Sequence, residues 1–168
     1  KAGNSLLGIH NLDQLYYLTM QPDGMSTGGG AGKQLFAQDI EQAVKEALVL
    51  REEIRNRPVR DIRDIEVMAH LNDQARAKLA TPDLIADALT GETLVNAGKS
   101  NDLKAALTRL SVVSGSAIIN PVEAQPLKRQ AEIALATDID NGIPRQPFHW
   151  PLAFPEVFTG ENGGFDAF

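Results

Sequence analysis

Apolar residues recur every three or four positions through the middle of the chain, which is the spacing of an amphipathic helix. In residues 34–56 an apolar stripe faces a side rich in Lys, Glu, Arg and Gln. Pro58 ends this stretch, because the residue before a proline avoids the α conformation. A second stretch, Asp61 to Leu79, has the same pattern. We therefore predict an antiparallel helical hairpin that turns near Pro58. The apolar positions of the first stretch are Phe36, Ile40, Ala43, Val44, Ala47, Leu48 and Ile54.

Signals for helix ends divide the next part of the chain into three more helices. Thr81, Pro82 and Asp83 are an N-cap residue, a first-position proline and a first-turn acid, so we predict that a new helix begins there. Gly98 is predicted to end this helix, and Gly115 and Pro121 are predicted to bound the end of the following one. The three helices span about residues 81–98, from 101 to an end between 115 and 121, and 123–137. The predicted fold is mainly α, a bundle of about five helices with short extended segments at both ends.

The amino-acid composition limits the classes of protein to which this chain can belong. The 168 residues are 43% hydrophobic and 23% charged, as in soluble globular domains, and no apolar run is long enough to cross a bilayer. Without cysteine the chain has no disulfide and no thiolate metal site. His10, His70 and His149 lack metal-ligand spacing, so we predict structural or solvated roles for them and no metal site. These features suit a cytoplasmic protein without a membrane partner.

Two loops resemble binding motifs but fail their requirements. The Gly-rich stretch within residues 21–33 has Thr27 where a phosphate-binding loop needs glycine, and Gln34 where it needs Ser or Thr. The turn at 138–142 brings its glycine one position too early for a calcium loop, and His149 stands where that loop needs glutamate. We predict a flexible connection and a helix-ending turn. No nucleophile motif or carboxylate pair is recognisable, so the chain shows no catalytic residue of its own.

Five arginines cluster in and just after the first helix of the hairpin. Acidic residues are interspersed among them, which is typical of a solvated helix with exposed ion pairs. Contact with nucleic-acid phosphates is the alternative role. The net charge of −6 argues against strong DNA binding by this chain alone, because phosphate neutralisation dominates such affinity. The candidate DNA-binding residues are Arg51, Arg55, Arg57, Arg60 and Arg63.

The last part of the chain carries the most specific pattern. It reads Phe-x-Trp-x-Leu-x-Phe-Pro-Glu-Val-Phe and then, after a short loop, Gly-Phe-Asp. This pattern resembles the segment before the catalytic motif of large adenine-N6 DNA methyltransferases, found in type IIG-like restriction–modification and phage-defence systems. In that family the segment continues into Asn-Pro-Pro-Tyr/Phe. The matching residues are Phe148, Trp150, Leu152, Phe154, Pro155, Glu156, Val157, Phe158, Gly164, Phe165 and Asp166.

The start of the chain is similar to another stretch of the same family. Residues 3–8 match its Gly-[Asn/Asp]-Ser-Leu-[hydrophobic]-Gly stretch, and residues 35–40 match the Leu-Phe-x-x-Asp-[Leu/Ile] opening of its helical insertion. The resemblance implies that Asn4 lies near the adenine ring of S-adenosylmethionine, where its side-chain oxygen can accept from the amino group. The alternative is that Asn4 and Ser5 cap a turn.

The resemblance also implies a division of the chain. Residues 1–20 are expected to be an edge of the methyltransferase core, 21–33 a loop, 34–140 the helical insertion, and 141–168 the return to a core strand. The family's Gly-rich cofactor loop and its Asn-Pro-Pro-aromatic motif are expected before and after this chain. We therefore expect both ends to be interior to a longer enzyme, and this segment alone to be inactive and without S-adenosylmethionine.

The expected partners follow from the same resemblance. They are DNA, reached through the full-length enzyme, and the rest of the methyltransferase domain. An apolar surface left by the missing core would also promote self-association of the segment. The alternative is a free-standing helical interaction module whose aromatic tail docks on a protein partner.

Overall fold

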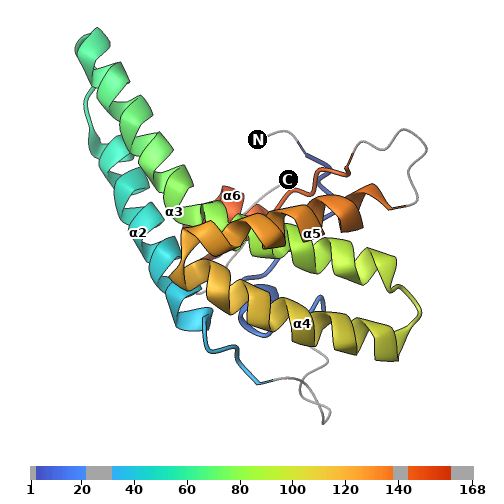
Figure 1. Cartoon of the computed structure of the whole chain (residues 1–168). Helices are drawn as coiled ribbons and strands as arrows, with labels where there is room; N and C mark the ends of the chain where they lie inside the picture. Colours follow the sequence, from blue (N-terminus) through green and yellow to red (C-terminus); the bar gives the residue numbers. More distant parts are fainter. Residues whose placement is uncertain (1–2, 22–31, 138–143, 160–168) are drawn as a thin grey trace.

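The computed structural model describes residues 3–21, 32–137 and 144–159, and this part of the chain is 72% helical without any strand. Helices α2, α3, α4 and α5 pack into a bundle, which confirms the mainly α prediction (Figure 1). The core gathers side chains from all four helices and from the N-terminal segment. Its largest fully buried apolar side chains are Ile9, Leu15, Ile40, Ile85, Leu89, Leu110 and Leu127. The predictions for the Gly-rich loop, the 138–142 turn and residues 164–166 concern parts of the chain outside these ranges, apart from the loop's edges.

Helix α2 (Ala37–Asn56) and the first half of α3 (Ile62–Val95) form the predicted hairpin, which extends away from the bundle (Figure 1). Helix α2 buries its apolar stripe, and Pro58 lies in the connection as expected. Helix α3 begins with a capping box. The Asp61 side chain accepts from the backbone N–H of Asp64, and the Asp64 side chain accepts from that of Asp61. Local capping therefore sets where the second arm of the hairpin starts.

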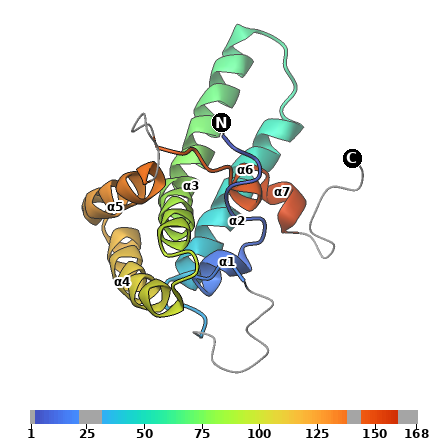
Figure 2. The ribbon, with the colours of Figure 1, turned by 90° about the vertical axis from the view of Figure 1, so that its right-hand side faces the viewer.

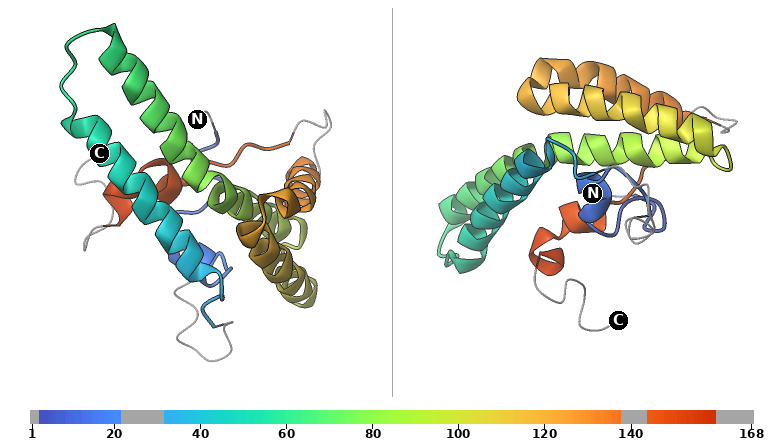
Figure 3. Two further views of the ribbon diagram at one scale, coloured as in Figure 1. Left: turned by 60° about the vertical axis from the view of Figure 1, so that its left-hand side comes forward. Right: turned by 90° about the horizontal axis from the view of Figure 1, so that it is seen from below.

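The predicted helix start at Thr81 is wrong. Helix α3 continues through Pro82 as one 34-residue helix, and Pro82 is buried inside it. A proline after threonine suits a first helical turn, but the same residue is tolerated inside a helix that bends. Figures 1 and 3 show α3 changing direction between its two halves. Burial of the segment that follows Pro82 offsets the loss of one backbone hydrogen bond, so packing overrides the local signal.

The second half of α3 packs between α4 (Ser100–Ile119) and α5 (Ala124–Ala136), and a 3-10 turn at Pro121–Glu123 joins those two helices. Gly91 permits a close approach, because a Cβ there would lie 2.7 Å from the Cβ of Ala134. Helix α4 ends within the predicted bounds, at Ile119 just before Pro121. Gly115 lies inside the helix, where a Cβ would be 3.7 Å from Phe36.

The two ends of the described chain run side by side. The N–H of Asn4 donates to the Gln146 carbonyl at 2.7 Å, and the N–H of Phe148 donates to the Leu7 carbonyl at 2.7 Å. These contacts flank an isolated parallel bridge between Asn4 and Pro147. Gly8 has a φ of 135°, and a Cβ there would lie 2.5 Å from the Phe148 carbonyl, so glycine is required at this crossing.

Beyond the paired segments, each end forms short helices. The N-terminal segment leads into α1 (Asp13–Tyr16). The aromatic stretch is extended only as far as His149 and then forms α6 (Trp150–Ala153) and α7 (Pro155–Phe158). The short extended segment predicted at this end is therefore limited to the residues before α6. Both helices have a proline at the first or second position, where its fixed φ suits a helix start.

Candidate nucleic-acid groove

A groove of about 860 Å³ lies between the α2–α3 hairpin and the α6–α7 segment. Figure 2 shows α6 and α7 beside α2, on the side of the hairpin away from α4 and α5. The hairpin wall is rich in arginine and the opposite wall is aromatic. The polar and aromatic lining residues are Arg51, Arg55, Asn72, Arg76, Asp83, Phe148, His149, Phe154 and Glu156.

Arg51 joins the two walls of the groove. Its Nη1 donates to the Ala153 carbonyl at 2.8 Å and to Glu156 Oε2 at 3.0 Å, and its side chain is only 20% exposed. The guanidinium of Arg51 therefore holds the α6–α7 segment against α2. Of the five predicted DNA-binding arginines, this one has a structural role in the described chain.

Arg55 and Arg76 are the exposed arginines of the groove. Arg55 lies on α2 and Arg76 on α3, and neither forms an ion pair with a carboxylate among the described residues. Arg76 was not among the sequence candidates because it lies far from the cluster in sequence. The antiparallel packing of α2 against the first half of α3, which includes a salt bridge between Lys78 and Glu46 at 2.7 Å, brings Arg76 to the groove. The tertiary structure thus places Arg55, which the sequence indicates, and Arg76, which it does not, in the same groove.

The other three predicted arginines do not line the groove. Arg57 Nη2 donates to Glu53 Oε1 at 2.9 Å, one helical turn away. Arg60 and Arg63 lie at the tip of the hairpin and use their backbone N–H groups in the Asp61–Asp64 cap. The arginine cluster is therefore divided between the groove and the tip.

Three aromatic rings form the opposite wall and its support. The rings of Phe148 and Trp150 meet edge to face with centroids 4.9 Å apart, and Phe154 lies 6.2 and 6.0 Å from them. Trp150 Nε1 donates to the Ser5 carbonyl at 3.1 Å, which ties the rings to the N-terminal segment. Phe154 still exposes 37% of its surface.

His149 links the floor of the groove to both ends of the chain. Its ring is buried, Nδ1 accepts from the Ile9 N–H at 3.2 Å, and Nε2 lies 2.9 Å from Asp87 Oδ1. Because a backbone N–H can only donate, the ring is neutral in this arrangement and its proton is on Nε2, which donates to Asp87. These contacts give His149 a structural role, one of the two roles that the sequence left open. The described ranges contain no group of three or more His, Cys, Asp or Glu that could hold a metal ion.

Asn4 lies at the surface beside the paired segments. It is exposed, and its Oδ1 accepts from the N–H of Leu6 at 3.1 Å. This is the turn-capping role that the sequence left open as an alternative. A carboxamide oxygen has two lone pairs, so this bond leaves capacity for a second donor.

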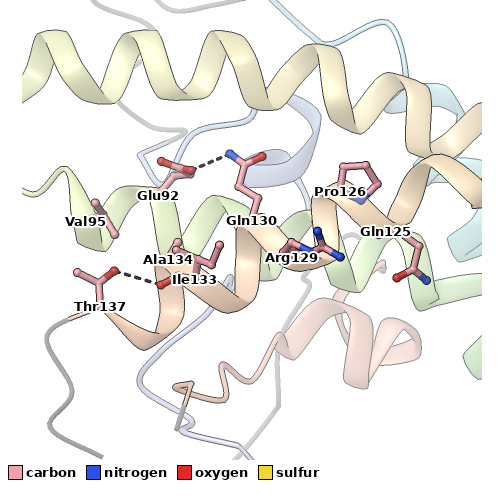
Figure 4. A pocket seen from close by; sticks show the side chains of 9 residues that line it. All are labelled: Glu92, Val95, Gln125, Pro126, Arg129, Gln130, Ile133, Ala134 and Thr137. Carbon is pink, nitrogen blue, oxygen red and sulfur yellow. Dashed lines mark hydrogen bonds between the residues drawn. The ribbon is translucent and has the colours of Figure 1, made fainter. Parts of the chain in front are cut away.

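A second hollow, of about 560 Å³, lies between the end of α3 and α5 (Figure 4). Its polar contacts are internal: Gln130 Nε2 donates to Glu92 Oε1 at 2.7 Å, and Thr137 Oγ1 donates to the Ile133 carbonyl at 3.1 Å. Val95 and Ile133 add exposed apolar surface. This hollow offers packing surface, with Arg129 as its one cationic lining residue.

Comparison of the chain with models of protein families, with curated proteins and with solved structures found no match. Among the helices in the described ranges, none combines the length and apolar character that crossing a bilayer requires. The sequence motifs, the groove and the paired ends are therefore the observations that indicate a function.

Proposed function

We propose that this chain is the helical insertion of a large S-adenosylmethionine-dependent adenine-N6 DNA methyltransferase, and that it performs no chemical step itself. The observation that carries the proposal is the pairing of the two ends. The stretches that resemble the methyltransferase family stand at opposite ends of the sequence, yet they lie side by side through the Asn4–Gln146 and Leu7–Phe148 hydrogen bonds.

This pairing is what an insertion requires. An inserted unit leaves and re-enters its host at neighbouring points, so its ends must be close. Here a parallel bridge joins Asn4 and Pro147, and the helical bundle accounts for the chain between them. The paired segments would adjoin the core sheet of the enzyme, and the bundle would project from it.

The groove is the DNA-facing part of this proposal. Arg55 and Arg76 place two guanidinium groups on one wall, and Asn72 adds an amide. The net charge of −6 implies that most of the phosphate contacts are made by the rest of the enzyme. The insertion would therefore position DNA without supplying most of the affinity.

Asn4 is the residue that we assign to the cofactor. Its exposed side chain stands beside the bridge that would adjoin the core, and its oxygen can accept from the adenine amino group of S-adenosylmethionine while still bound to the Leu6 N–H. The full-length enzyme would supply the rest of the cofactor site and the motif that receives the flipped adenine.

The test uses the full-length product of the gene that encodes this chain. We expect it to transfer radiolabelled methyl groups from S-adenosylmethionine to unmethylated DNA, and mass spectrometry of the digested DNA to detect N6-methyladenine. DNA already methylated at N6 of adenine is the control and should accept no label. A product with no methyl transfer, whose reading frame also lacks an Asn-Pro-Pro-aromatic motif, would contradict the proposal and favour the interaction module.

Asn4 can be tested in the same assay. We expect Asn4→Ala to raise the KM for S-adenosylmethionine about tenfold, as for the loss of one hydrogen bond to a bound ligand. Asn4→Asp keeps an acceptor oxygen and should retain most of the affinity. Equal KM values for wild type and Asn4→Ala would leave Asn4 with the turn-capping role alone.

A further inference from the structure

We infer that the groove binds an unpaired stretch of DNA, with Arg55 and Arg76 on successive phosphates and the exposed ring of Phe154 stacked on a base. This deepens the proposed function by assigning the groove a strand type and a contact mode, and it rests on that function only for the choice of DNA.

The charges of the groove favour an anion on the hairpin wall. Arg51 and Glu156 neutralise each other across the groove at 3.0 Å. The other charged lining residues are Arg55, Arg76 and Asp83, so arginines outnumber acids along the groove. Since guanidinium groups present several donors in a plane, each can hold one phosphate through two hydrogen bonds.

The aromatic wall favours a base. Phe154 exposes 37% of its surface, and its position is set by ring contacts with Phe148 and Trp150. Proteins that bind single strands combine a positive groove along the backbone with aromatic rings on which bases stack. In duplex DNA the faces of the bases are covered by their neighbours, so a ring on the wall of a groove cannot stack on them.

The size and anchoring of the groove suit a ligand of this kind. Its volume of about 860 Å³ lies within the usual range for ligand sites. The Arg51 clamp and the buried His149, bonded to both Ile9 and Asp87, hold the aromatic wall at a set distance from the hairpin. The site is therefore built before any ligand arrives, which limits the ordering cost of binding.

The test measures binding of the 168-residue chain to a short fluorescent oligothymidylate by anisotropy, at low and at increasing salt. Two phosphate contacts predict a log–log salt slope of about −1.4. Arg55→Ala and Arg76→Ala should each weaken binding about tenfold and reduce the slope to about −0.7. Arg63→Ala is the matched control, because it removes the same charge from an exposed helical position that does not line the groove.

The stacking contact has its own variants. Phe154→Ala should weaken binding by at least about fivefold. Phe154→Leu keeps an apolar side chain against Phe148 and Trp150 but removes the ring, so it should show a similar loss while preserving the fold. Circular dichroism melting of each variant separates a loss of contact from a loss of structure.

Four results would overturn the inference: no binding of the oligonucleotide, equal loss with Arg63→Ala, tighter binding to a duplex of the same length, or no effect of either Phe154 variant. Deoxyadenosine monophosphate bound as tightly as the oligonucleotide would identify a free-nucleotide site and would also overturn it. Because these measurements need no methyl transfer, they can fail while the full-length product methylates DNA, and the reverse also holds.

Discussion

The two halves of α3 show how one helix can serve two purposes. The outer half, residues 62–81, lies against α2 and buries a single stripe. The inner half, residues 82–95, lies among α4, α5 and the paired ends, and half of its positions are buried. The outer buried residues are Leu71, Ala75 and Leu79; the inner ones are Pro82, Ile85, Ala86, Ala88, Leu89, Thr90 and Gly91.

This difference in burial determines which half of α3 can carry exposed polar side chains for binding. The exposed positions of the outer half include Asn72 and Arg76 of the groove and Arg63 of the tip. In the inner half a polar side chain has to be satisfied internally, as Thr90 is by its bond to the Ala86 carbonyl at 2.8 Å. The hairpin can therefore vary its charge without disturbing the bundle, and the bundle sets the direction of the hairpin.

Truncating one leucine in each half of α3 is expected to change stability more than any other substitution considered below. Leu89→Ala should cost about 3–5 kcal/mol of unfolding free energy, because its surroundings cannot collapse into the cavity. Leu71→Ala, at 8% exposure in the outer half, should cost about 2 kcal/mol. Urea denaturation measures both. Equal losses would show that the two halves are packed alike.

The next prediction uses two glycines inside helices. Gly91→Ala should destabilise the chain by about 1–3 kcal/mol, since the new methyl would meet Ala134 at 2.7 Å. Gly115→Ala should stabilise it by about 0.5–1 kcal/mol, because there the methyl has ordinary contact and alanine favours the helix. Thermal melting compares them. A stabilised Gly91→Ala variant would mean that α3 and α5 are not closely packed.

A smaller loss is expected at the link between the inner half and the paired ends. Asp87→Ala should cost about 1–2 kcal/mol, because the buried Nε2–H of His149 loses its acceptor. Asp87→Asn retains an acceptor oxygen and should cost about half as much. Chemical denaturation of the two variants checks this. Identical losses would indicate that the negative charge matters more than the hydrogen bond.

The smallest effect concerns Tyr16, at the end of α1 beside the bundle. Burial, and then the charges of Glu41 and Asp13, raise its pKa to about 12. An unfolded tyrosine titrates at about 10, so the contribution of Tyr16 to stability is present below pH 10 and is lost as the pH rises towards 12. Phenolate absorbance should show the late step in wild type and lack it in Tyr16→Phe. A chain whose only steps lie near pH 10 would contradict this.

Several elements could be predicted because their signals are local. The stripe of α2, the turn near Pro58 and the helix after residue 123 each depend on residues within a turn or two of one another. The start at Pro82 failed for the opposite reason. Threonine, proline and aspartate fit the beginning of a helix, but the burial that keeps α3 continuous comes from distant segments.

The candidate site could be predicted only in part. The sequence indicates Arg55 through its cluster, yet it also indicates Arg57, Arg60 and Arg63, which lie elsewhere. Arg76 has no local signal, because the register of the hairpin is what brings it to the same wall of the groove as Arg55. The five arginines of the cluster are alike by sequence, and only the fold separates them.

The mainly α class, the hairpin and the motifs at both ends can be recognised from the order of amino acids, because helix propensity, capping and apolar periodicity act over a few residues. The tertiary structure alone decided that α3 runs unbroken through Pro82, that Arg55 and Arg76 share a groove with Phe154, and that the ends meet between Asn4 and Pro147. Each of these depends on burying surfaces that are far apart in the chain. Such burial is a property of the whole fold, and no short stretch of sequence specifies it.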